Sequence, residues 1–223
     1  MPTVVLATRN AHKVLEIRAL LGQASSCLTL NDFSEAPDVV EDAGSFAGNA
    51  TKKAVELAWW LACLPKTEGA GRSLLVLADD SGLEVDALNG APGVFSARFS
   101  APDGSGNAPD ADNNAKLLRL LQGVPSASRT ARFRCVIALT RVPDFFGGAA
   151  GKRMGDLQAV TRVFEGVCEG RIEAAARGQG GFGYDPLFVP DGFEQCFAEL
   201  GGEVKNRISH RARALEKLRV AGV

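Results

Sequence analysis

A run of apolar residues that ends in adjacent carboxylates most constrains what this chain can fold into. Leu74–Ala78 is wholly apolar, which favours a strand buried on both faces. Asp79, Asp80 and Ser81 follow without a spacer, and we expect the strand to end there. Adjacent carboxylates at such a place are costly unless a cation or hydrogen-bond donors compensate their charge. Because successive side chains of an extended chain point to opposite sides, one carboxylate should face a cation and the other should brace the loop.

Length and charge narrow the class of protein. A chain of 223 residues suits one substantial α/β domain, and we predict a single domain over residues 1–223. Its 25 basic and 26 acidic residues give a formal net charge of −1. That balance argues against a general binder of nucleic acid or of anionic membranes, so any anion site should be local.

The cysteines and the apolar runs indicate where the protein works. The five cysteines are widely spaced and include no C-x-x-C pair, which indicates neither a disulfide framework nor a zinc site. No apolar run approaches the length of a membrane span, and the first residues lack the pattern of a secretory signal. We therefore predict a cytoplasmic protein without membrane contact and with mostly buried thiols.

The first residues predict a strand, a tight polar turn and a helix. Val4–Ala7 is apolar enough for a buried strand, Asn10 is suited to cap the helix that follows, and Gly22 is suited to end it. The free backbone N–H groups at the start of such a helix, with Lys13 beside them, could seat an anion. An ordinary capped helix with a surface lysine would give the same pattern, so this stretch alone does not distinguish an anion site from such a helix.

A second helix is predicted after Ser45, which is a suitable cap. Asn49 and Lys53 lie one turn apart on its polar face, opposite an apolar stripe. In isolation, this face is best explained by exposure to solvent. Glu41, just before the helix, is equally consistent with a loop carboxylate and with a metal ligand.

The middle of the chain predicts a helix followed by two strands. The helix should begin near Asp112, and Ala131–Thr140 should be a strand because charged and apolar residues alternate at its start. Leu157–Val163 also alternates, which predicts an antiparallel partner strand, joined to the first by the glycine-rich segment Pro143–Asp156. The G-x-G-x-x-G match that begins at Gly178 lacks the strand and helix that a dinucleotide site requires, and we reject it.

The last part of the chain places aromatic and charged residues on a glycine-rich turn and a helix. Phe182, Tyr184 and Asp185 lie on the turn, which could bring an aromatic face and a carboxylate against a planar ligand. Ser209 is suited to cap the last helix, which begins with a His-Arg pair. A basic pair at a helix start opposes the local dipole, and a functional role and an ordinary solvated helix start explain it about equally well.

Together these segments resemble the inosine triphosphate pyrophosphatases, which act on ITP, dITP and XTP. The motifs of the resemblance run through the whole chain: Thr8–Lys13, Glu41–Ala54, Leu77–Arg98, Gly180–Phe188 and Lys205–Arg211. The resemblance implies a magnesium-dependent enzyme, usually a homodimer, that hydrolyses a purine nucleoside triphosphate to the monophosphate and pyrophosphate. It also implies an α/β fold with an elongated mixed β-sheet flanked by helices, in two lobes with a central substrate cleft.

The resemblance assigns roles to individual residues of this chain. Glu41 and Asp80 would be the magnesium ligands, and Asp80 would also be the proton acceptor. The residues implied to hold the phosphates are Thr8, Asn10, Lys13, Lys53 and Ser81, and those implied to form the base pocket are Phe182, Gly183, Tyr184, Asp185, Lys205, His210 and Arg211. In the first motif, Arg9 replaces a small residue that is common in the family.

The chemistry of the reaction gives reasons for these roles. A helix N-terminus, two lysines and a hard divalent cation balance a triphosphate, and magnesium prefers oxygen ligands while keeping several waters. One carboxylate is poorly suited to be both a metal ligand and a free base, so we expect Asp80 to act through a metal-bound water, with Asp79 or Glu84 as the alternative base. Donors from His210 or Arg211 would read O6 and N7 of the purine and reject adenine.

Two other functions stay open from the sequence. One is a pyrophosphatase of related architecture that acts on modified pyrimidine triphosphates, although the His-Arg pair favours purines. The other is a nucleotide-sensing or single-stranded RNA-binding protein without catalysis. The near-neutral charge and the scarcity of clustered aromatic residues argue against RNA.

Overall fold

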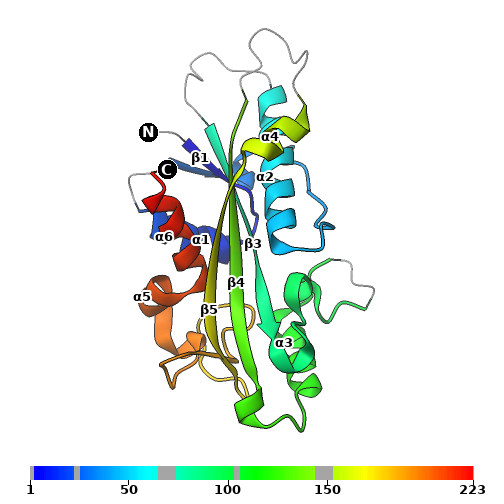
Figure 1. The fold of residues 1–223 in the computed structure, drawn as a ribbon, viewed down its shortest axis with the longest axis vertical. Coiled ribbons are helices and arrows are strands. Elements are labelled where there is room, and N and C mark those ends of the chain that lie inside the picture. The colour runs from blue at the N-terminus through cyan, green and yellow to red at the C-terminus, as the bar shows by residue number, and fades with distance from the viewer. Residues whose placement is uncertain (1–2, 23–25, 65–73, 103–105, 144–152, 223) are drawn as a thin grey trace. The chain divides into compact units, whose positions relative to one another are not determined.

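The fold is an α/β architecture built on one mixed sheet. The structure is a computed structural model (Figure 1) that describes residues 3–22, 26–64, 74–102, 106–143 and 153–222. Its six-stranded sheet has the order β2-β1-β3-β4-β5-β6. Strand β1 runs parallel to β2 and β3, whereas β6 runs antiparallel to β5. The predicted mixed sheet flanked by helices is therefore confirmed.

The elements have the following bounds. The strands are β1 Thr3–Leu6, β2 Ser26–Thr29, β3 Leu74–Val85, β4 Thr130–Arg141, β5 Arg162–Ile172 and β6 Phe188–Pro190. The helices are α1 Ala11–Leu21, α2 Phe46–Cys63, α3 Asp110–Leu120, α4 Met154–Val160, α5 Phe197–Ile208 and α6 His210–Val220. Short 3-10 turns lie at Leu30–Asp32, Asp86–Leu88, Gly93–Arg98 and Ser126–Ser128.

The chain divides into two compact units. Unit 1 consists of Met1–Asp80 and Val136–Phe164, and unit 2 consists of Ser81–Cys135 and Glu165–Val223. Strands β3, β4 and β5 contribute residues to both units. Within the described residues, none of the helices is both long enough and apolar enough to cross a membrane.

Unit 1 contains the parallel strands, which are buried by a helix on each side. Val5 of β1 and Val76 of β3 pair in register and are fully buried. Helices α1 and α2 lie on opposite sides of these strands (Figure 1). Asn10 caps α1 by accepting a hydrogen bond from Lys13 N, and Ser45 caps α2 in the same way, so both predicted caps are confirmed.

Unit 2 has its own hydrophobic core. The core joins inward-facing residues of the strands to helices α3 and α5 and to the glycine-rich segment before β6: Leu83, Val85, Leu117, Leu121, Ala131, Phe133, Cys168, Ile172, Tyr184, Leu187, Phe188 and Phe197. The predicted alternation at the start of β4 is confirmed, because Phe133 is buried between two arginines that are only half-buried. Ser209 caps α6 by accepting from Ala212 N, as predicted.

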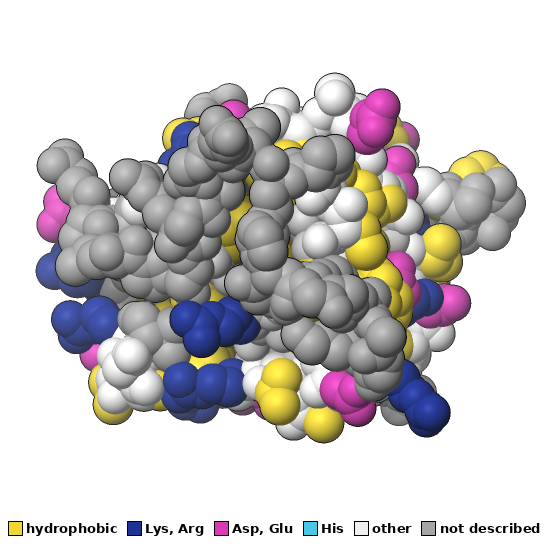
Figure 2. Space-filling view, turned by 90° about the horizontal axis from the view of Figure 1, so that it is seen from above, with side chains coloured by type: hydrophobic (Ala, Val, Ile, Leu, Met, Phe, Trp, Pro, Cys, Tyr) yellow, Lys and Arg dark blue, Asp and Glu magenta, His cyan; other side chains and the backbone are white. Residues whose placement is uncertain are grey.

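Charged side chains of both signs occur together on the surface. On the described part of the face shown in Figure 2, Lys and Arg side chains lie among Asp, Glu and hydrophobic ones. Three of the five cysteines are buried, which confirms the prediction of mostly buried thiols.

Two predictions of strand boundaries are wrong. Strand β3 does not end at Asp79 but continues through Asp80 to Val85, because the carboxylates find partners on both faces of the sheet, as described below. Leu157–Val163 is not a strand: α4 occupies it up to Val160, and β5 begins only at Arg162. One buried residue, Leu157, suffices to pack this short helix against α2, and such a segment is too short for its apolar period to be diagnostic.

Other predicted segments fall partly outside the described residues. Most of the glycine-rich segment Pro143–Asp156 does so, although its last residues begin α4, where Asp156 accepts a hydrogen bond from Arg153 N at 3.0 Å. Helix α3 begins at Asp110, close to the predicted start. Helix α5 has no counterpart in the prediction.

The close approach of α6 to β5 requires glycine at position 166. A Cβ atom at Gly166 would overlap the carbonyl oxygen of His210 and lie 2.5 Å from Ala214 N, both of which belong to the backbone of α6. The first turn of α6, which carries predicted base-pocket residues, is therefore held against the sheet by the absence of a side chain.

We predict that Gly166→Ala lowers the free energy of unfolding by roughly 3 kcal/mol, because backbone must move to admit the methyl group. Gly155→Ala in α4 is the matched control, since a Cβ atom there meets nothing within 4 Å. It should leave stability unchanged or raise it by up to about 1 kcal/mol. Urea denaturation measures both, and equal losses in the two variants would contradict the prediction.

Candidate active site

The carboxylates of β3 point to opposite sides of the sheet and meet different helices. Asp79 Oδ1 lies 2.5 Å from Lys13 Nζ on α1, and its side chain is fully buried. Asp80 Oδ2 accepts a hydrogen bond from Asn49 Nδ2 on α2 at 3.0 Å. The prediction that one carboxylate faces each side is confirmed. Asp79, however, braces no loop, because it stays in the strand and pairs with α1.

Lys53 on α2 lies at the centre of the polar contacts of unit 1. Its Nζ donates to Glu41 Oε1 at 3.0 Å and to the carbonyl oxygen of Asp79 at 2.7 Å. The same nitrogen lies 3.8 Å from Asp80 Oδ1. Both Lys53 and Asn49 are buried, so the interpretation of this helix face as solvent-exposed is wrong.

Asn49 is a site residue that the sequence-based set omitted. In addition to its bond to Asp80, its Oδ1 accepts from Ala43 N at 3.0 Å, which fastens the loop that carries Glu41. The sequence indicated this role only through the position of Asn49, one turn before Lys53 on the same face of α2. Asn49 thus positions both carboxylates at once.

The electrostatics of this group favour a further cation. Burial raises the pKa of Asp80 above its ordinary value, and the nearby Glu41 carboxylate adds to the rise. The Lys53 and Lys13 ammonium groups and the bond from Asn49 lower it in part. Additional positive charge beside these carboxylates would therefore stabilise their ionised forms.

The donor set fits a hard divalent cation. Glu41 and Asp80 approach the same ammonium group, so their carboxylates converge on one position, and both supply the oxygen ligands that Mg²⁺ prefers. Among the residues that the structure describes, no three His, Cys, Asp or Glu side chains are grouped so as to hold a metal. A cation bound here would need further oxygens from water or from a ligand, which suits Mg²⁺ with a phosphate.

Side-chain hydrogen bonds order the turn before α1, where the sequence predicted an anion seat. Thr8 Oγ1 accepts from Asn10 N at 3.1 Å, and Asn10 Oδ1 accepts from Lys13 N at 3.1 Å, which orders the start of the helix. Arg9 turns away from this seat: its Nη2 donates to Ala36 O at 2.6 Å, and its guanidinium pairs with Asp38. The arginine at this position therefore serves the neighbouring loop.

Unit 2 brings together a second group of predicted residues around Phe182. Lys205 Nζ on α5 lies 4.6 Å from the centroid of the Phe182 ring and 2.5 Å from Asp185 Oδ2. The same carboxylate oxygen accepts from Phe182 N at 2.9 Å. The Arg211 guanidinium carbon lies 6.0 Å from the ring centroid. Two cations and one aromatic ring thus form a compact platform.

The remaining predicted residues of unit 2 are more deeply placed. Arg211 is buried, and its Nη2 donates to Ser81 Oγ at 3.0 Å. The His210 ring stacks on Phe133 at a centroid distance of 4.8 Å. Tyr184 is also buried, and its hydroxyl donates to Ser96 O at 2.9 Å, so its side chain serves the core.

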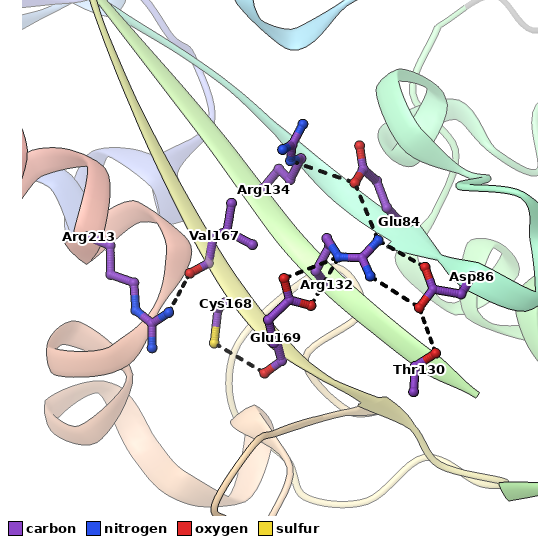
Figure 3. A network of polar contacts seen from close by, with 9 residues as sticks. All are labelled: Glu84, Asp86, Thr130, Arg132, Arg134, Val167, Cys168, Glu169 and Arg213. Atoms are coloured by element: carbon purple, nitrogen blue, oxygen red, sulfur yellow. Dashed lines mark hydrogen bonds and ion pairs between the residues drawn. The ribbon is translucent and has the colours of Figure 1, made fainter. Parts of the chain in front are cut away.

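Glu84, an alternative base, belongs to a separate polar cluster. Figure 3 shows Arg132 between acidic side chains, with its guanidinium 3.9 Å from Glu84, 2.9 Å from Asp86 and 3.0 Å from Glu169. Glu84 also lies 3.7 Å from Arg134 Nε. Its carboxylate is therefore engaged by two guanidinium groups.

The arrangement defines a class of protein. Paired carboxylates that face a buried lysine, next to a capped helix start with its own lysine, provide what a nucleoside polyphosphate and a divalent cation require. An α/β fold with such a group of charges is typical of proteins that bind nucleotides. The chain belongs to the Ham1 family, whose family model matches residues 4–221.

Relatives and solved structures agree with this placement. The chain is 46% identical over 215 residues to a dITP/XTP pyrophosphatase of Desulforamulus reducens. The matched residues make up 96% of this chain and 92% of the relative. The chain is 45% identical over 221 residues to a dITP/XTP pyrophosphatase of Geobacillus kaustophilus, covering 98% and 93%. The fold is similar to that of a HAM1 protein from Coxiella burnetii, with a TM-score of 0.77, 37% identity and coverage of 99% and 98% of the two chains.

Adjacent lysines of α2 offer a test of the buried contacts. Without divalent cations, Lys53→Met should cost about 3–5 kcal/mol of unfolding free energy, because it leaves carboxylates uncompensated. Lys52→Met should cost at most about 1 kcal/mol, since Lys52 pairs with the exposed Asp42. Urea denaturation of the two variants measures the difference, and similar costs would contradict the arrangement described.

Proposed function

We propose that this protein hydrolyses non-standard purine nucleoside triphosphates, such as ITP, dITP and XTP, to the monophosphate and pyrophosphate, and so removes them from the nucleotide pool. The observation that carries the proposal is the convergence of Glu41 and Asp80 on Lys53 beside the capped start of α1. The two relatives described above, both dITP/XTP pyrophosphatases, support it over nearly the full length of the chain.

The residues of unit 1 would bind the triphosphate and the cation. Lys13 and Lys53 supply positive charge, and the capped turn at Thr8 and Asn10 supplies the helix start that attracts anions. The carboxylates of Glu41 and Asp80 would hold Mg²⁺. When bound, Mg²⁺ would neutralise charge on the phosphate oxygens and orient them for attack.

Asp80 would act through a bound water rather than as a free base, and the proton of the attacking water would pass to it as the bond between the α- and β-phosphates is cleaved and pyrophosphate leaves. Asn49 holds its Oδ2, which leaves Oδ1 as the oxygen directed toward Lys53. Asp79 is paired with Lys13 on the opposite face, and Glu84 is engaged by arginines. These contacts favour Asp80 over the other two candidates.

The residues of unit 2 would recognise the base. Phe182 offers a face on which a purine can stack, and Lys205 and Arg211 place donors beside that face. O6 of hypoxanthine or xanthine would accept from such donors, whereas the amino group of adenine would leave them unpaired. Ser81, bonded to Arg211, would contact the phosphates.

Further parts of the proposal come from the length and composition of the chain and from its resemblance to the family. They are a single domain over residues 1–223 in two lobes, a homodimer, and a cytoplasmic location without nucleic-acid or membrane partners. A pyrophosphatase for modified pyrimidine triphosphates and a nucleotide sensor without turnover are the alternatives that the next experiment separates.

The central test is a product assay with Mg²⁺ over a panel of nucleotides. ITP, dITP and XTP should yield pyrophosphate and monophosphate, with ATP and pyrimidine triphosphates hydrolysed far more slowly. Asp80→Asn should lower kcat/KM by roughly 10²–10⁴-fold, as the loss of a general base does. Asp86→Asn, in the separate arginine cluster, should leave it unchanged. Release of single phosphates, or normal turnover in the Asp80 variant, would refute the proposal.

The metal assignment has a test that does not depend on activity. If Glu41 and Asp80 hold Mg²⁺, a concentration one hundred times Kd should stabilise the protein by about 2.7 kcal/mol and raise Tm. Glu41→Gln should remove this rise, whereas Glu56→Gln on the outer part of α2 should keep it. Thermal unfolding with and without Mg²⁺ measures the effect. An equal rise in both variants would exclude Glu41 as a ligand.

A further inference from the structure

Helix α3 contacts the segment that carries Phe182, although nothing above assigns this helix to the site. Asp110 and Asn114 are four residues apart, so they lie on one face of α3. Asp110 Oδ2 accepts a hydrogen bond from Gly183 N at 2.6 Å, and Asn114 Nδ2 donates to Gly183 O at 2.9 Å. The two side chains therefore hold both backbone polar groups of one glycine.

The position of Gly183 gives this contact its consequence. Its φ of 62° is in the left-handed region, which glycine adopts without strain, and the chain reverses direction there. The N–H that Asp110 accepts belongs to the peptide unit that joins Phe182 to Gly183. Fixing the plane of this peptide restricts the direction in which the Phe182 side chain leaves the backbone.

The neighbours of Gly183 are anchored by other elements of unit 2. Tyr184 is tied to Ser96 through its hydroxyl, and Asp185 is tied to Lys205. Within the turn, Phe182 N donates to Asp185 Oδ2, and Asp185 N donates to Phe182 O at 3.2 Å. The hydrogen bonds from α3 to Gly183 join this stretch to another element of the fold. Their loss would loosen the peptide that carries the Phe182 ring, while Tyr184 and Asp185 keep their own anchors.

We propose that Asp110 and Asn114 are positioning residues for base selectivity, which keep the Phe182 ring against Lys205 and Arg211. The proposal rests on the function proposed above and adds residues to its recognition step. Neither side chain touches the reacting atoms. Their removal should therefore weaken the recognition of the preferred base and leave the chemical step intact.

The variants Asp110→Ala and Asn114→Ala test the proposal in the full-length protein. Each removes one hydrogen bond, which corresponds to about a fivefold change in an equilibrium. We expect KM for ITP to rise by about that factor with kcat unchanged, and the ratio of kcat/KM for ITP over ATP to fall. Asp110→Asn, which keeps an acceptor at the same place, should restore most of the selectivity.

The matched control is Asp112→Ala, which removes a carboxylate from the same exposed turn of α3. It also controls for the interaction of an acidic residue with the helix start. Its KM and its selectivity should equal those of the wild type. Thermal unfolding of all variants separates a change in selectivity from a loss of stability.

Three results would overturn the inference. Asp110→Ala and Asn114→Ala could match Asp112→Ala in both KM and selectivity, or they could lower only Tm, which would make the contact purely structural. A fall in kcat at constant KM would place the effect on the chemical step. If the wild-type protein does not hydrolyse ITP at all, the proposed function fails and the inference fails with it. If the wild-type protein is active and the variants are unaffected, only the inference fails.

Discussion

A buried ammonium group is the interaction on which the rest of the unit 1 site depends. Lys53 contacts Glu41, Asp80 and the backbone of Asp79, and its charge offsets the repulsion between the half-buried Glu41 and the buried Asp80. Its place follows from α2, whose apolar stripe packs on the sheet while Asn49 and Lys53 turn inward on a neighbouring face. Asn49 then fixes the Glu41 loop through Ala43.

Unit 2 also contains a buried lysine that pairs with a carboxylate, but there positive groups outnumber negative ones. Lys205 is buried and paired with Asp185, but it and Arg211 surround an aromatic ring instead of a second carboxylate. In unit 1 the carboxylates of Glu41, Asp79 and Asp80 outnumber the ammonium groups of Lys13 and Lys53. In unit 2 two cations lie beside the ring of Phe182.

The sequence could predict what depends on local rules and could not predict what depends on contacts between distant segments. The alternation of side chains in a strand placed Asp79 and Asp80 on opposite faces, and short polar residues marked the caps of α1, α2 and α6. The extent of β3 and the burial of Asn49 depend on partners 26 to 66 residues away, so the polar face of α2 alone could not reveal that Asn49 is buried. The motifs gathered most site residues, but the contact of α3 with Gly183 spans 69 or more residues and was invisible to them.

Lys53, which lies between Glu41 and Asp80, is a counter-ion built into the chain. Because this counter-ion is covalently attached, it reaches Glu41 and Asp80 with α2 itself, and its single positive charge balances part of their negative charge. A cation bound by Glu41 and Asp80, as proposed above, would lie next to an ammonium group that cannot leave, and the repulsion between the two positive charges would oppose its binding.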